Sequence, residues 1–337
     1  MTDIGHPKQR RHGFRLSLVV PIFNEESSCQ GFFERAIPAL QEVTENFEIV
    51  CVNDGSTDQS LELLHRLHAA EPRIKIVDLT RNFGKELALT AGLELASGDA
   101  VIPIDADLQD PPELIPKLVE RWLEGFDMVV AVREDRRSDS WVKRTTSHLF
   151  YRVIGRIGDV PVPSNAGDYR LIDRTVVEVL KRLPERNRFM KGIFAWVGFR
   201  QAVVTYTRPA RAAGESKWGY WKLWNLALEG VFSMSTLPLR VWTYFGVGVA
   251  FLAGCYMMFI VVRTLLFGTD VAGYPSLFVA VLFFSGINMV GLGILGEYVG
   301  RIFVEVKQRP LYLVNETIGF DRPARDPEAQ QEKHPDR

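Results

Sequence analysis

The fold class that the sequence predicts is α/β, with a doubly wound, mostly parallel sheet, followed by amphipathic interfacial helices and two transmembrane helices. Short apolar runs alternate with helical segments over residues 16–132, and charged residues follow the apolar runs. This alternation is typical of a parallel sheet covered by helices on both faces. Further along the chain, two stretches of about the length of a membrane span carry no charged residue.

The apolar runs are expected to form strands at residues 16–21, 47–52, 74–79, 100–104 and 128–132. Helices are expected between them, at about 28–45, up to about 70, 86–96 and 113–124, and Ser56 or Thr57 is expected to cap the second helix. In such a sheet the ligand binds beyond the carboxyl ends of the strands. Charged residues gather at those ends: Glu25, Asp54, Asp78, Asp105, Asp107 and Arg133.

The acidic run DADLQD, residues 105–110, directly follows the fourth apolar run. If strand alternation continues through the run, Asp105 and Asp107 lie on one side of the chain. With the amide oxygen of Gln109 they form an all-oxygen ligand set, which suits magnesium or manganese better than zinc. The alternative is that the run only starts the next helix, because Asp110 is followed by two prolines and a glutamate.

Residues 241–262 and 276–296 are predicted to span a membrane, because each run is apolar on all faces and therefore a poor match for a buried core helix. Arg240, Arg301, Lys307 and Arg309 flank the spans on the expected cytosolic side, and Arg263 at the far end is an exception. The N-terminal region has no signal peptide. We therefore expect a multi-pass membrane protein with both termini in the cytosol.

The chain is expected to divide into four parts. These are a flexible N-terminus (1–13), a cytosolic catalytic domain (14–235), a two-helix transmembrane domain (236–300) and a cytosolic C-terminal segment (301–337) that is disordered after about residue 321. Two segments of the cytosolic part, near 141–157 and 218–234, are amphipathic or rich in tryptophan. They are expected to lie in the lipid headgroup layer, and packing on the core domain is the alternative.

Composition excludes several classes of function. The 337 residues carry a net charge of −1, so nothing suggests binding to nucleic acid. The glycine-rich patterns GxGxxG and GxxxxGK do not occur within residues 14–235, where the sheet is expected, which argues against a dinucleotide enzyme and a P-loop NTPase. Cys29, Cys51 and Cys255 form no metal or redox spacing, which fits a reducing compartment.

Three motifs resemble the nucleotide-sugar-binding signature of family-two, inverting glycosyltransferases with the GT-A fold: VVPIFNE (19–25), VNDGSTD (52–58) and DADLQDPP (105–112). Two more, RAAGESKW (211–218) and GILGEYVGR (293–301), resemble the membrane-bound polyprenyl-phosphate glycosyltransferases of that family, the group of bactoprenol glucosyltransferase and dolichol-phosphate mannose synthase. The resemblance runs from about Phe14 to about Phe320, almost the whole chain.

The resemblance implies a role for each matching position. Pro21, Glu25 and Asp54 would line the pocket for the base and ribose, although Asp54 is also a common turn residue. Asp105, Asp107 and Gln109 would bind Mg²⁺ or Mn²⁺ and, through it, the sugar diphosphate.

Basic residues would hold the phosphates of the donor or of the lipid acceptor. The positions implied are Arg133, Arg211 and Lys217, with Arg170 as a further candidate; Lys217 has the alternative of a snorkelling surface lysine. Asp168 would lie near the acceptor and the donor sugar, where it positions groups or acts as a weak base. A helix cap for residues 171–180 is the alternative for Asp168.

The resemblance implies transfer of a sugar from a nucleotide-diphosphate donor, UDP-glucose or a related UDP-sugar, to undecaprenyl phosphate at the cytosolic membrane face. The product would serve glycan modification of the cell envelope, such as that of lipopolysaccharide. Relatives form tetramers, so a homo-oligomer is expected. The alternatives are a processive membrane polysaccharide synthase and a non-catalytic membrane partner. Intact Asp105, Asp107, Arg133 and Lys217 argue against the partner, and the synthases' Gln-x-x-Arg-Trp signature is absent because Leu118 precedes Arg121-Trp122.

Overall fold

The fold was analysed in a computed structural model that describes residues 13–133, 166–183, 185, 186, 188, 190–206, 237–267 and 273–320. Its centre is a sheet in the order β7-β5-β6-β4-β1-β2-β3-β8. The strands are β1 (Leu16–Ile22), β2 (Phe47–Asn53), β3 (Ile74–Leu79), β4 (Ala100–Pro103), β5 (Met128–Arg133), β6 (Ala166–Asp173), β7 (Gln201–Tyr206) and β8 (Val314–Ile318). The predicted α/β class is thus confirmed.

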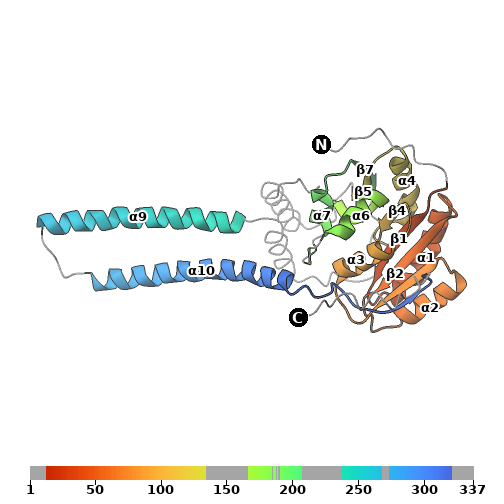
Figure 1. Ribbon diagram of the computed structural model, residues 1–337, viewed down its shortest axis with the longest axis horizontal. Coiled ribbons are helices and arrows are strands. Elements are labelled where there is room, and N and C mark those ends of the chain that lie inside the picture. The colour runs from red at the N-terminus through yellow and green to blue at the C-terminus, as the bar shows by residue number, and fades with distance from the viewer. Residues whose placement is uncertain are drawn as a thin grey trace, which may run out of the picture.

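Helices cover both faces of the sheet (Figure 1). One face carries α1 (Glu26–Gln41), α2 (Ser60–Ala70) and α4 (Ile115–Leu123), with the 3₁₀ turn η1 (Pro112–Leu114) before α4. The other face carries α3 (Lys85–Leu95), α6 (Arg174–Arg182) and α7 (Met190–Trp196). Strand β1 is buried almost throughout because it lies in the middle of these three layers.

The five strands predicted from the sequence all run in one direction, because β1 pairs in parallel with β2 and β4, and β2 with β3. Strand β5 keeps that direction without touching β4. Strand β6 lies between them and is antiparallel to both. The strands β6, β7 and β8 were missed from the sequence. Because β6 and β8 are antiparallel to their neighbours, the sheet is mixed, and it is mostly parallel as predicted.

The helix boundaries differ from the prediction where turn chemistry differs. Helix α2 begins at Ser60, and its N-cap residue is Gln59, so the expected cap by Ser56 or Thr57 is wrong. The side chain of Asp58 accepts a hydrogen bond from the Ser60 backbone N–H at 3.0 Å instead. Helix α6 has a side-chain cap, in which Asp173 accepts from the Thr175 N–H at 2.9 Å.

A buried carboxylate, that of Glu48, connects neighbouring strands near the amino end of the sheet. The Glu48 side chain is fully buried and forms ion pairs with Lys75 at 2.8 Å and Arg15 at 3.0 Å. It also accepts hydrogen bonds from the Ser17 hydroxyl at 2.6 Å and the Ser97 backbone N–H at 2.6 Å. Burial alone would raise the pKa of Glu48, but these hydrogen bonds outweigh it and lower the pKa to about 2.

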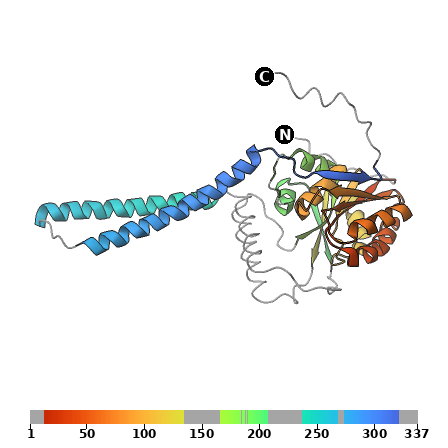
Figure 2. The same ribbon diagram turned by 90° about the horizontal axis from the view of Figure 1, so that it is seen from below.

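Two long helices, α9 (Leu237–Phe267) and α10 (Tyr274–Val306), leave the α/β domain and run side by side (Figures 1 and 2). Their apolar side chains are exposed: 74% of Tyr244 and 70% of Phe251 are accessible. Within α10, Phe283–Val306 is long and apolar enough to cross a membrane, with a mean hydropathy of 1.3. The apolar stretch of α9, Val241–Tyr256, is shorter than that of α10.

The chain returns from α10 to the sheet. Strand β8 pairs antiparallel with β3, and the Arg186 backbone N–H donates to Glu305 near the end of α10 at 2.9 Å. The Thr80 N–H also donates to the Leu313 carbonyl at 3.0 Å. The residues after α10 are therefore an integral part of the α/β domain up to Phe320.

Candidate active site

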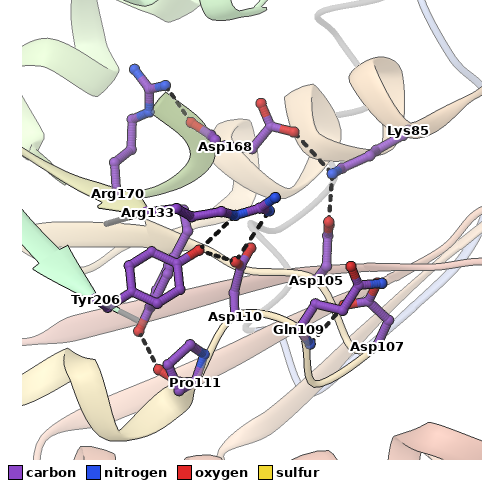
Figure 3. A network of polar contacts seen from close by, with 12 residues as sticks. Lys85, Asp105, Asp107, Gln109, Asp110, Pro111, Arg133, Asp168, Arg170 and Tyr206 are labelled. Atoms are coloured by element: carbon purple, nitrogen blue, oxygen red, sulfur yellow. Dashed lines mark hydrogen bonds and ion pairs between the residues drawn. The ribbon is translucent and has the colours of Figure 1, made fainter. Parts of the chain in front are cut away.

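The carboxyl edge of the parallel strands carries the candidate site. Strand β6 runs in the opposite sense, so its first residues reach the same edge, as the pairing of Val132 with Ala166 shows. Asp168 therefore lies beside the acidic run although the two are far apart in the chain (Figure 3). The alternative that Asp168 caps a helix is wrong, because Asp168 is inside a strand and Asp173 is the cap of α6.

The acidic run forms a turn rather than the end of a strand. Strand β4 ends at Pro103, so strand alternation does not bring Asp105 and Asp107 to one side, and that part of the prediction is wrong. Leu108 adopts φ +59°, a left-handed conformation that is rare for a bulky residue. The turn allows the Gln109 backbone N–H to donate to Asp107 at 3.1 Å, and the Gln109 side-chain amide also donates to Asp107.

Asp105 faces a residue that sequence reasoning missed. The Nζ of Lys85 lies 2.7 Å from Asp105 Oδ2 and 2.9 Å from Asp168 Oδ2 (Figure 3). Burial alone would lower the pKa of Lys85, but the two carboxylates raise it above its ordinary value. One signal in the sequence was available: a lysine in the first turn of a helix is disfavoured by the helix dipole, so it needs nearby acidic partners.

Arg170 lies behind Asp168 on β6 and is 4% exposed. Its Nη2 donates to the Gly167 carbonyl at 2.7 Å, and its guanidinium lies 4.1 Å from the centre of the Phe194 ring. Burial lowers the pKa of Arg170 to about 10, against the opposing attraction of Asp168 and Glu86. These contacts support the segment of β6 that carries Asp168, whereas the predicted phosphate contact needs an exposed guanidinium.

Asp110 belongs to a buried cluster and does not cap a helix, because the N-cap residue of η1 is Pro111. The Tyr206 hydroxyl donates to Asp110 and accepts from Arg133 Nε at 3.2 Å, while Arg133 Nη2 lies 3.7 Å from Asp110. Burial and the Asp110 carboxylate together raise the pKa of Tyr206 to about 12. The cluster fixes Arg133 at the carboxyl end of β5, at the edge where the acidic turn lies.

Asp54 is 3% exposed, and its two carboxylate oxygens accept the backbone N–H groups of Phe83 at 2.7 Å and Gly84 at 2.9 Å. Burial raises the pKa of Asp54 in spite of these hydrogen bonds. Gly55, at φ +65°, sits under the same segment, where a Cβ would lie 2.4 Å from the Arg81 carbonyl carbon. Asp54 therefore holds the loop that leads to Lys85, and its predicted role in the base and ribose pocket stays a prediction.

Glu25 ends the loop after β1, and Pro21 lies in β1 opposite Val52 of β2. The Ser28 hydroxyl donates to Glu25 at 2.5 Å. Burial raises the pKa of Glu25, and the charges of Asp107 and Asp105 add to the increase. Glu25 therefore lies close enough to the acidic turn for the turn's carboxylates to raise its pKa.

Asp78 lies at the carboxyl end of β3, the edge where it was expected. It is 8% exposed and accepts side-chain amide hydrogen bonds from Asn53 at 2.7 Å and Asn315 at 2.8 Å. Asp78 therefore attaches β8 to the sheet. Arg211, Lys217 and the segments near 141–157 and 218–234 lie outside the described residues.

Among the described residues, no three His, Cys, Asp or Glu side chains converge to hold a metal ion. The acidic turn offers the carboxylates of Asp105 and Asp107 and the amide oxygen of Gln109, and the ammonium of Lys85 lies against it. The turn therefore attracts positive charge with oxygen ligands, as a magnesium or manganese site does.

The fold and this edge belong to a sugar-transferring enzyme of the family-two class. The model of "Glycosyl transferase family 2" matches residues 17–181. The chain is 51% identical over 304 residues to the "SfII prophage-derived bactoprenol glucosyl transferase" of Shigella flexneri, covering 90% of this chain and 98% of that one. It is 52% identical over 306 residues to an "Uncharacterized glycosyltransferase" of Synechocystis, covering 91% of this chain and 96% of that one.

The chain belongs to glycosyl transferase family 2 and is a glycosyltransferase. A solved structure of glucosyl-3-phosphoglycerate synthase from Mycobacterium tuberculosis, in complex with Mn²⁺, UDP and phosphoglyceric acid, is 22% identical with a TM-score of 0.45. The match covers 66% of this chain and 77% of the chain in that structure.

Proposed function

We propose that this glycosyltransferase moves a glucosyl unit from UDP-glucose to bactoprenol (undecaprenyl) phosphate at the cytosolic face of the bacterial inner membrane. The observation that carries the proposal is the identity of about half of all residues to several bactoprenol glucosyl transferases, over 98% of their length. The matched length includes the two long helices as well as the sheet, so the similarity also covers the helices that we assign to the membrane.

The connection between site and helices supports a lipid acceptor. Strand β7 ends, and β8 begins, at the carboxyl edge where the acidic turn lies, because β7 is parallel to β5 and β8 is antiparallel to β3. Strand β7, which precedes α9 in the chain, and strand β8, which follows α10, therefore both reach the carboxyl edge of the sheet that carries the candidate site. A phosphate at a membrane surface approaches the same edge.

We propose that both helices cross the membrane. Helix α9 has 31 residues and α10 has 33. At about 1.5 Å per residue each exceeds the roughly 30 Å of the hydrocarbon core. Two crossings leave the N-terminal sheet and the C-terminal strand β8 on one side, as their pairing requires. The protein is then multi-pass, with both termini in the cytosol.

The donor is held, in this proposal, by residues of the carboxyl edge. Pro21, Glu25 and Asp54 belong to the base and ribose side. Asp105, Asp107 and Gln109 hold Mg²⁺ or Mn²⁺, which supplies neutralisation of charge on the leaving diphosphate. The remaining phosphate contacts are assigned to a set of basic residues: Arg133, Arg211 and Lys217.

The acceptor needs positioning more than activation. A phosphate monoester has a second pKa of about 6 and is therefore mostly dianionic at neutral pH. The nucleophile is one of its oxygens, which attacks the anomeric carbon as the bond to the diphosphate breaks. Asp168 is assigned a positioning role or weak base assistance, and Arg170 supports the segment of β6 that carries Asp168. The cationic residues reduce repulsion between the acceptor phosphate and the donor diphosphate.

We further propose a homo-oligomer, a tetramer by the family resemblance. Cross-linking of the protein in native membranes tests this state.

The test of the reaction is incubation of membranes containing the full chain with labelled UDP-glucose, bactoprenol phosphate and Mn²⁺ or Mg²⁺. We expect a labelled lipid that is extractable into organic solvent. Its absence with UDP-glucose and with other UDP- and GDP-sugars contradicts the proposal. The ranking of residues is tested by Asp107→Asn and Asp168→Asn, and it is wrong if the first keeps most activity while the second abolishes it.

A further inference from the structure

Lys85 joins two elements that carry separate predicted site residues. Its Nζ contacts Asp105 of the acidic turn and Asp168 of β6, at 2.7 and 2.9 Å (Figure 3). The side chain of Lys85 is 43% exposed, so part of it is accessible to solvent. In the described part of the chain, Lys85 is the residue whose salt bridges link the acidic turn to β6.

The position of Lys85 is built by its backbone. Asp54 receives the N–H groups of the two preceding residues, Phe83 and Gly84. Gly84 adopts φ +98°, which favours glycine and turns the chain into α3. The next residue, Glu86, accepts from the Met190 N–H at 3.4 Å. Hydrogen bonds therefore fix the residues on both sides of Lys85, and with them the point from which its side chain extends.

The location is electrostatically costly unless the carboxylates are present. Lys85 stands in the first turn of α3, where the positive end of the helix dipole repels a cation. Asp105 and Asp168 offset this repulsion at close range. Conversely, a positive charge beside Asp105 lowers the attraction of the turn for any other cation.

We propose that Lys85 is a positioning residue that fixes Asp168 against Asp105 and occupies the cation-binding end of the acidic turn until the donor arrives. The inference rests on the proposed function. Its consequence is that the donor-free enzyme binds a divalent cation weakly. The cation and the sugar diphosphate then bind together, because the diphosphate supplies negative charge that compensates the ammonium.

The experiment measures Mn²⁺ binding to the donor-free full chain in nanodiscs by isothermal titration calorimetry. Removal of one unit charge a few ångströms from a partly exposed site predicts about tenfold tighter Mn²⁺ binding for Lys85→Gln. Lys85→Met, of similar length without the charge, gives the same result and serves if Lys85→Gln does not fold. Lys85→Arg keeps the charge, and its Mn²⁺ affinity stays within about threefold of the original.

The matched control is Lys117→Gln, which removes the same charge from an exposed position on α4 and leaves the Mn²⁺ affinity unchanged. In transfer assays with saturating donor and Mn²⁺, both neutral variants of Lys85 lower kcat by tenfold or more, with a smaller change in the KM for UDP-glucose, because Asp168 has lost its partner.

Neutral variants that bind Mn²⁺ no more tightly than the original overturn the proposal for Lys85. If the original chain transfers no sugar under any donor, the proposed function has failed instead. If it transfers sugar while Lys85→Gln leaves both Mn²⁺ affinity and kcat unchanged, only the role of Lys85 is wrong.

Discussion

Replacement of Glu48 by glutamine probes how much one buried carboxylate stabilises the sheet. Ionised Glu48 has a pKa of about 2, against 4.5 for an ordinary glutamate. The difference corresponds to about 3 kcal/mol of stability from ionisation, at roughly 1.4 kcal/mol for each pH unit. A lowered carboxyl pKa means that this stability is present above pH 4.5 and is lost as the pH falls from 4.5 towards 2. By the same arithmetic, about 2 kcal/mol remains at pH 3.5.

The assay is urea unfolding of the full chain in detergent, followed by tryptophan fluorescence, at pH 7 and at pH 3.5. At pH 7 we expect Glu48→Gln to lose about 3–5 kcal/mol, since Lys75 and Arg15 lose a buried partner. At pH 3.5 the loss shrinks by about 1.4 kcal/mol because part of the ionisation stability is already gone. The control is Glu45→Gln, whose side chain is 81% exposed. A loss of equal size at both pH values refutes the argument.

Three further predictions concern the site. Gly55→Ala is expected to weaken UDP-glucose binding and lower the melting temperature more than Gly31→Ala, because a Cβ at Gly55 meets the Arg81 backbone at 2.4 Å whereas a Cβ at Gly31 makes only an ordinary 3.8 Å contact with the Leu108 side chain; equal effects contradict this account. Tyr206→Phe is expected to destabilise the fold by about 1–3 kcal/mol in urea unfolding, because buried Asp110 loses its donor. The exposed Tyr244→Phe is its control, and a stable Tyr206→Phe variant is the opposing result. Removal of divalent cations with EDTA is expected to abolish glucosyl transfer to bactoprenol phosphate, with recovery on addition of Mn²⁺ or Mg²⁺; transfer that persists in EDTA argues against a cation at Asp105 and Asp107.

The central strands were predictable because they are short, continuous apolar runs, and burial on both faces requires that pattern. Strand β7 escaped detection because it is an edge strand that alternates exposed and buried residues over six positions only. Strand β8, VNETI, carries apolar residues only at its two ends and is held by pairing to β3 and by the amide of Asn315. A local pattern cannot reveal such long-range pairing.

For the candidate site, the acidic turn and its neighbours Glu25 and Arg133 were found because they follow apolar runs. Asp168 was found only by family resemblance, since its place beside Asp105 depends on the antiparallel insertion of β6. Lys85 was missed because one lysine in a helical segment looks like a solvated surface residue, and only the fold shows the two carboxylates around it. Asp78 was correctly expected at the carboxyl edge, but its hydrogen bond from Asn315 could not be predicted because β8 was missed.

Strand β8 also bears on the order of assembly during synthesis. The strand follows α10 in the chain, so the edge of β3 has no partner until both long helices have been made. An unpaired strand edge invites association with other chains. Completion of the catalytic sheet therefore waits until both helices have been synthesised, and, with both helices crossing the bilayer as proposed, a second helix that fails to cross would keep β8 on the wrong side and leave β3 open. Such a chain is expected to aggregate or be degraded, which couples folding of the enzyme to delivery at the membrane where its substrate resides.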